Sequence, residues 1–185
     1  AGCDQPRVLF IPTAMDDAPE QVDAFHKLYE KKFGCEVQVL KLIRDSPSLP
    51  QIKALTDNSD IIYAGPGNTK RMLDIWRQKG LDSLLRRAAG KGTVMCGISA
   101  GAICWFSKGH SDFMRYQRGE EWVYGPVAGL GLIHAIFCPH YHTQKREADL
   151  AEMVVETGLS AIACDDDAAF VVEEDRCRVL PVSPG

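Results

Sequence analysis

Short apolar runs alternate along this chain with stretches in which apolar residues recur at helical spacing. The runs predict buried strands and lie at residues 8–11, 37–40, 61–64, 93–96 and 135–138. The stretches beside them predict helices at residues 18–33, 49–55, 69–78, 81–89 and 144–157. Shorter apolar runs near the end of the chain predict strands at residues 161–164, 170–172 and 178–182.

This alternation predicts an α/β fold. Strands that are apolar throughout favour a mostly parallel sheet with helices on both faces. We find no linker, repeat or low-complexity segment, so residues 1–185 predict a single domain. Residues 107–126 are polar and have no clear period. We therefore expect a long loop there, covering the functional site.

Composition narrows the classes of function. The chain is 45% hydrophobic and 25% charged with a net charge of −4, which argues against a nucleic-acid partner. It has no apolar stretch of about 20 residues and no secretion-signal pattern, so we expect no membrane partner. Its seven cysteines include no C-x-x-C pair, which favours neither disulfides nor a zinc site. We expect a cytoplasmic protein with no metal or cofactor.

The most informative motif is G-I-S-A-G at residues 97–101, which follows the apolar run 93–96. Strand, sharp turn and helix around a serine are typical of a nucleophile elbow, with Ser99 at its apex. The apolar residues 102–106 are expected to continue the helix. The alternative is that Ser99 only caps this helix. The strand before it and the helix after it favour the elbow.

Sites in parallel sheets form at the carboxyl ends of strands, so the residues just after each strand should converge. The turn G-P-G-N-T at residues 65–69 follows one strand and opens a helix. Backbone amides in such a turn can bind a developing oxyanion. Pro66 has no amide hydrogen, which leaves Gly67 and Asn68 as donors. The alternative is an ordinary turn in which Asn68 or Thr69 caps the next helix.

Two histidines follow the strand that ends at Cys138. Histidine is the usual general base near neutral pH. His140 lies nearer the strand end and is preferred over His142. Its orienting acid could come from the run of aspartates at 165–167, after the strand 161–164, or from Asp112 in the predicted loop. An isolated charge run can also be a solvated turn.

These segments together resemble the family of serine peptidases that contains aspartyl dipeptidase (peptidase E) and cyanophycinase. The family motifs are G-G-N-T, G-x-S-A-G-A, N-P-H-F/Y and I-D-E-x-T-A. The matching segments are G-P-G-N-T at 65–69, G-I-S-A-G-A at 97–102, C-P-H-Y at 138–141 and A-C-D-D-D-A-A at 163–169. Order and spacing agree over residues 7–180. The resemblance implies a flavodoxin-like layout similar to that of class I glutamine amidotransferases.

The resemblance also implies roles for individual residues. Ser99 would be the nucleophile and His140 the base, with the amides of Gly67 and Ala100 forming the oxyanion hole. Asp166 stands where aspartyl dipeptidase has a glutamate and is one methylene shorter. Asp112 matches another acidic position of the family and could take its place. Pro66, in place of a glycine, is a second departure from the family pattern.

The resemblance implies a peptidase for small peptides, specifically a dipeptidase that prefers an N-terminal aspartyl residue. A cation is then needed for the substrate carboxylate, and the candidates are Arg146, Lys145 and Arg115, with Asn68 as a further substrate contact. The family also suggests a homodimer. Two alternatives stay open, namely cleavage of isoaspartyl or cyanophycin-like peptides, and a catalytically impaired binding protein on the same scaffold.

Overall fold

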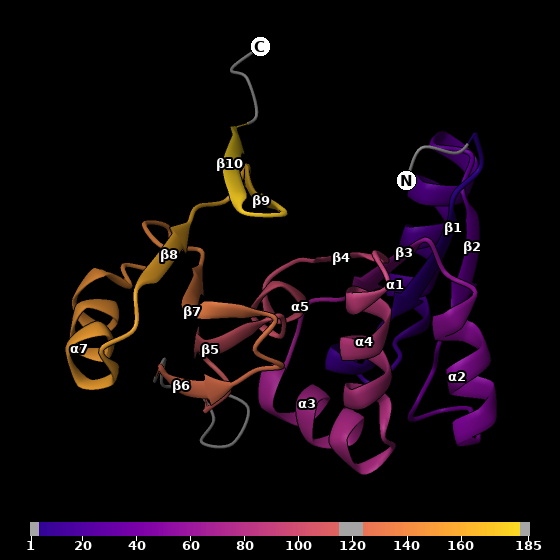
Figure 1. Ribbon diagram of the computed structural model, residues 1–185, viewed down its shortest axis with the longest axis horizontal. Helices are drawn as coiled ribbons and strands as arrows, with labels where there is room; N and C mark the ends of the chain where they lie inside the picture. Colours follow the sequence, from indigo (N-terminus) through magenta and orange to yellow (C-terminus); the bar gives the residue numbers. More distant parts are fainter. Residues whose placement is uncertain (1–3, 115–123, 182–185) are drawn as a thin grey trace.

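A computed structural model describes residues 4–114 and 124–181 of the chain (Figure 1). The α/β class predicted from the sequence is confirmed, but the strands form two four-stranded sheets and a separate hairpin where one sheet was expected. The first sheet is parallel throughout, in the order β2-β1-β3-β4. Its strands are β1 (Arg7–Ile11), β2 (Glu36–Val39), β3 (Ile61–Ala64) and β4 (Val94–Gly97).

Helices cover both faces of this first sheet, because β1 buries alternate side chains on opposite sides. Val8 and Phe10 pack on the face covered by α1 (Pro19–Phe25), which continues as the π-helix η2 (His26–Lys32). Leu9 and Ile11 pack on the other face. The helices there are α2 (Leu49–Asp57), α3 (Thr69–Gln78) and α4 (Leu81–Gly90). A short 3-10 helix, η1 (Thr13–Met15), follows β1.

The second sheet has the order β6-β5-β7-β8 and is parallel except for the β5–β6 pair. Its strands are β5 (Phe106–Ser111), β6 (Gly125–Ala128), β7 (Ile133–Pro139) and β8 (Ala161–Cys164). Helix α7 (Glu147–Thr157) connects β7 to β8. The two sheets are linked by α5 (Ala100–Ile103), which lies between them (Figure 1).

The expected loop at residues 107–126 is therefore wrong at both ends, where β5 and β6 form. Strand β5 buries the polar side chains of His110 and Ser111, and within the described residues Nε2 of His110 has no hydrogen-bond partner. The Ser111 hydroxyl donates to Thr69 Oγ1 at 3.1 Å, and the backbone carbonyl of His110 accepts from Arg146. A pattern of apolar positions cannot detect a strand that is buried in this way.

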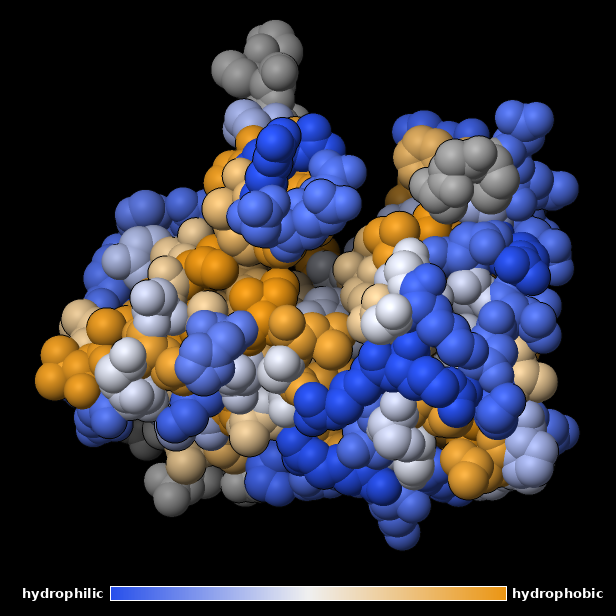
Figure 2. All heavy atoms as spheres, in the orientation of Figure 1, coloured by the Kyte–Doolittle hydropathy of each residue, from blue (hydrophilic) through white to orange (hydrophobic). Residues whose placement is uncertain are grey.

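The described chain ends in an antiparallel hairpin of β9 (Ala168–Glu173) and β10 (Arg176–Pro181). The hairpin projects from the second sheet beyond β8 (Figure 1). Figure 2 shows apolar side chains gathered near its base, over the hollow between the two sheets. Within the described residues, no helix is long and apolar enough to cross a membrane.

Candidate active site

The elbow forms where β4 ends beside β3. Parallel pairing sets Ala64 opposite Gly97, so the two strands end at the same level. Ser99 follows with φ 53° and ψ −115°, a conformation rare outside glycine, and α5 begins at the next residue. Only a glycine at position 101 lets α5 lie this close to the end of β3, because a Cβ atom there would lie 2.0 Å from the carbonyl oxygen of Ala64. The elbow therefore packs directly on the end of β3.

The turn after β3 holds its backbone in a conformation that requires glycine. Gly67 has φ 129°, and a Cβ atom there would lie 2.2 Å from the carbonyl oxygen of Ala14. The next amide, that of Asn68, donates to the same oxygen at 2.8 Å. Within the described residues, the backbone amides of Gly67 and Ala100 donate no hydrogen bond.

Asn68 has a structural task in this turn. Its side-chain oxygen accepts from the backbone amide of Arg71 at 3.0 Å and so caps α3. Because its own amide is also occupied by Ala14, Asn68 is not available as a second oxyanion donor through its backbone. Of the two predicted donors in this turn, the amide of Gly67 is therefore the one left for an oxyanion.

A histidine–aspartate pair joins the ends of β7 and β8. His140 follows β7 with φ 54°, and its Nδ1 lies 2.5 Å from Asp166 Oδ1. The other carboxylate oxygen, Oδ2, accepts from the Thr143 hydroxyl at 2.8 Å. The hydrogen bond with His140, followed by that from Thr143, lowers the pKa of Asp166. The shorter aspartate therefore reaches the ring.

A second pair lies beside the first. Asp165 accepts from the backbone amide of His142 at 2.8 Å, and its other oxygen lies 2.7 Å from His142 Nδ1. Its hydrogen bond with Asp165 raises the pKa of His142. The His142 side chain is 68% exposed, whereas that of His140 is 24% exposed. His142 therefore presents its ring to solvent, and His140 is the more enclosed of the two.

The other predicted cationic and acidic residues lie elsewhere. Arg146 is 2% exposed and does not face solvent. Its guanidinium donates to the carbonyl of His110 at 2.7 Å and to the side chain of Gln144, and it stacks on the Tyr124 ring at 4.5 Å. Arg146 is also not among the described residues that line the cavity of Ser99 and His140. Arg115 lies outside the described residues.

Asp112 lies near Tyr124, where burial raises the pKa of the phenol and the charge of Asp112 adds to that rise. In the described part of the structure it makes no hydrogen bond with His140, whose carboxylate partner is Asp166. No pattern in the sequence singles out Thr143, since a threonine three residues after a histidine is an ordinary occurrence. Only the pairing of the β7 and β8 ends brings it to Asp166.

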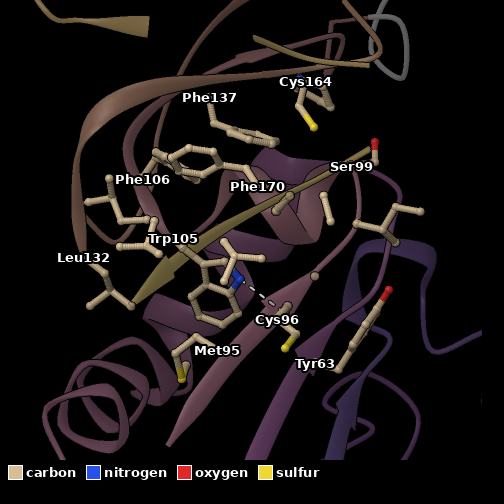
Figure 3. A pocket seen from close by; sticks show the side chains of 18 of the residues that line it. Tyr63, Met95, Cys96, Ser99, Trp105, Phe106, Leu132, Phe137, Cys164 and Phe170 are labelled. Atoms are coloured by element: carbon tan, nitrogen blue, oxygen red, sulfur yellow. Dashed lines mark hydrogen bonds between the residues drawn. The ribbon is translucent and has the colours of Figure 1, made fainter. Parts of the chain in front are cut away.

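Ser99, His140 and Asp166 all line one cavity of about 840 Å³ between the two sheets. Apolar side chains dominate the wall (Figure 3), among them Met95, Trp105, Phe106, Phe137 and Phe170. In this wall, the Trp105 indole donates to the carbonyl of Cys96 at 3.2 Å (Figure 3). The described lining holds four carboxylates and neither lysine nor arginine.

The Ser99 hydroxyl makes no hydrogen bond within the described residues, and so none to the His140 ring. Catalytic hydrogen bonds often tighten only when substrate binds. Within the same residues, no group of three or more histidine, cysteine or acidic side chains could hold a metal ion. The six described cysteines are all free. The chemistry that this arrangement offers is acyl transfer to a serine.

Known proteins are similar to this chain in sequence and in fold. The chain is 34% identical over 178 residues to YgaJ, an uncharacterized peptidase of Bacillus subtilis (strain 168), covering 94% of this chain and 72% of that protein. A crystal structure of a candidate peptidase E from Listeria monocytogenes EGD-e superimposes with a TM-score of 0.76 at 22% identity, covering 99% and 90% of the two chains. A peptidase from an acI-B1 actinobacterium gives a TM-score of 0.73 at 18% identity, covering 95% and 74%.

The two solved structures are too distant in sequence to carry more than the fold. The decisive observation is the match of the sequence model of peptidase family S51 to residues 1–180, almost the whole chain. It agrees with the resemblance carried by the elbow and histidine segments. The chain belongs to peptidase family S51.

Proposed function

We propose that this protein hydrolyses small peptides by acyl transfer to Ser99, with His140 as the general base. The observation that carries the proposal is the joint placement of the Ser99 elbow and the His140–Asp166 pair on one cavity. Asp166 occupies Nδ1 of the ring, which leaves Nε2 for the serine proton. Membership of a peptidase family indicates peptide hydrolysis as the reaction, and we assign its steps to Ser99, His140 and Asp166.

In the proposed reaction, Ser99 Oγ attacks the scissile carbonyl carbon while Nε2 of His140 takes its proton. The amides of Gly67 and Ala100 bind the resulting oxyanion, and each such donor is typically worth about 3 kcal/mol. The imidazolium then protonates the leaving amine as the tetrahedral intermediate collapses. Water attacks the acyl-enzyme with His140 again as base, which releases the acid and restores Ser99.

We further propose a dipeptidase with a preference for an N-terminal aspartyl residue, as the family resemblance implies. Four carboxylates and no cation line the cavity in its described part, so the cation for the substrate carboxylate must come from outside this lining. With the guanidinium of Arg146 enclosed, Arg115 and Lys145 are the candidates that remain. Turnover of α-aspartyl, β-aspartyl and leucyl dipeptides with one leaving residue separates this preference from isoaspartyl cleavage and from general dipeptidase activity.

Replacing Ser99 with alanine tests the nucleophile. We expect the rate of peptide hydrolysis to fall by at least about 10³-fold with unchanged folding, because no acyl-enzyme can form. A fluorophosphonate should label the unaltered protein at Ser99 and should not label S99A. Ser83→Ala is a matched control, since Ser83 is an exposed serine of α4 away from the cavity. Unchanged hydrolysis by S99A would exclude Ser99 as nucleophile.

A further inference from the structure

An aspartate at position 166 leaves its carboxylate weakly restrained unless something besides the histidine holds it. The Asp166 side chain is 46% exposed, so water competes with His140 for its oxygens. A carboxylate that bonds the ring through one oxygen can still rotate about its last side-chain bond. A catalytic pair requires a fixed plane, because Nδ1 must donate along one direction throughout the reaction.

The hydroxyl of Thr143 supplies a second restraint. It donates to Asp166 Oδ2 at 2.8 Å, while Oδ1 of the same carboxylate lies 2.5 Å from His140 Nδ1. Both partners belong to the turn that follows β7, so a single segment holds both oxygens. Two hydrogen bonds to different oxygens fix the plane of the carboxylate.

The turn that carries both partners is itself tied down. The backbone amide of Gln144 donates to the carbonyl of His140 at 3.0 Å, and His142 binds Asp165 through its amide and its ring. His140 itself has a positive φ of 54°. The turn after β7 is therefore matched to the residues after β8 by a set of four side-chain hydrogen-bond contacts.

We infer that Thr143 is a positioning residue, whose hydroxyl holds the Asp166 carboxylate in the plane where it accepts the Nδ1 proton of His140. The effect of Thr143 on catalysis rests on the proposed function. Thr143 acts only through Asp166 and touches neither substrate nor Ser99. The inference also accounts for how a side chain one methylene shorter than the family's glutamate serves this pair. The bond from Thr143 holds the shorter Asp166 side chain in the position that a longer glutamate side chain would reach without it.

The test compares Thr143→Val, which keeps the shape and loses the hydroxyl, with Thr143→Ser, which keeps the hydroxyl. For T143V we expect kcat on a small peptide to fall on the order of 10-fold with KM within about twofold, as for other outer-shell partners of a catalytic histidine. T143S should retain the kcat of the unaltered protein. Thr157→Val is the control, because Thr157, at the end of α7, loses the bond from its hydroxyl to the Met153 carbonyl and the one that it accepts from the Leu159 amide.

A second readout needs no activity. The Nδ1 proton of His140 in its short bond to Asp166 should give a low-field proton NMR resonance, which T143V should shift or broaden and T143S and T157V should leave in place. This result supports the inference even if no peptide is hydrolysed, in which case the proposed function alone fails.

An unchanged resonance and unchanged kcat in T143V overturn the inference. Lower thermal stability of T143V with an unchanged resonance also overturns it, because the hydroxyl then only supports the fold. Thr143 is exposed, and Thr143→Ala serves the same comparison should the valine variant misfold.

Discussion

At the scale of single residues, the site depends on one negative charge placed against one imidazole. The carboxylate of Asp166 can stabilise the imidazolium that forms when His140 takes the serine proton. Its neighbour Asp165 has the same side chain and the same kind of partner, but that partner, His142, points to solvent. The two aspartates therefore form an internal comparison, in which Asp166 holds His140 and the Thr143 hydroxyl, whereas Asp165 holds the ring and the backbone amide of His142.

Replacing Asp166 with asparagine should lower kcat on the order of 10⁴-fold. The amide removes the charge that stabilises the imidazolium and presents an N–H group where only acceptors suit Nδ1 of His140 and the Thr143 hydroxyl. Asp165→Asn is the matched control and should stay within about threefold of the unaltered protein, because its partner does not line the cavity. Steady-state hydrolysis of a chromogenic peptide by both variants measures the difference. Equal losses in the two variants would contradict the assignment of Asp166.

At the scale of elements, the regular parts of the fold were predictable because burial leaves a period in the sequence. Strands 61–64 and 161–164 and helix 69–78 have the bounds that their apolar patterns predict. The elbow helix was predicted to continue through Phe106, but it ends at Ile103, and Phe106 starts β5. A run of apolar residues is buried equally well in either conformation, so its composition does not reveal where the helix stops.

The candidate site was predictable to the extent that it follows strand ends. The segments containing Ser99, Gly67, His140 and Asp166 each follow a strand, and the parallel order brings three of these side chains to one cavity. The role of Thr143 was not predictable, because it depends on a turn with no sequence pattern meeting the residues after β8. The enclosure of Arg146 was not predictable either, because it depends on a contact with His110, which is far away in the sequence. Nor does any apolar period indicate which strands pair, and so the division into two sheets was missed.

Close packing of the elbow predicts a strong effect of Gly101→Ala. The added methyl would meet the Ala64 carbonyl oxygen at 2.0 Å, and a backbone atom cannot move away without displacing β3 or α5. We expect a loss of about 2 kcal/mol or more in the free energy of unfolding, with loss of hydrolysis. Gly90→Ala, at the end of α4, is the control, because a Cβ atom there meets nothing within 4 Å. Urea unfolding of both variants measures the contrast, and equal stabilities would contradict this packing.

At the scale of the whole molecule, polar groups of His110 and Arg146 are buried together beside the second sheet. His110 on β5 is 1% exposed, and its ring stacks on Tyr124 with centroids 4.9 Å apart. The Arg146 guanidinium lies against it, with 3.4 Å between Nη1 and Nδ1 of the ring. Burial, followed by the charge of Arg146, lowers the pKa of His110 to about 4, while Asp149 acts weakly in the opposite direction.

This lowered pKa makes the stability of the protein depend on pH in a definite direction. Between pH 6.5 and about 4, His110 takes up a proton in the unfolded chain and stays neutral in the folded one. The unfolded state then binds more protons, so the free energy of unfolding falls as pH falls, by up to about 1.4 kcal/mol per pH unit from this group. Above pH 6.5 both states are neutral, and the contribution of His110 is fully present.

His110→Gln isolates this effect, because glutamine does not titrate and all other groups are retained. Urea unfolding of the two proteins from pH 7.5 to 4 should give a stability difference that is constant above pH 6.5. Below that pH the difference should shift steadily in favour of the variant, because only the unaltered protein loses the contribution of His110. Parallel curves over the whole range would mean that His110 takes up its proton equally in both states, and the buried cluster would then not exclude the charge. A shift confined to the pH window below 6.5 would show that the second sheet, away from the proposed catalytic pair, makes the fold sensitive to acid.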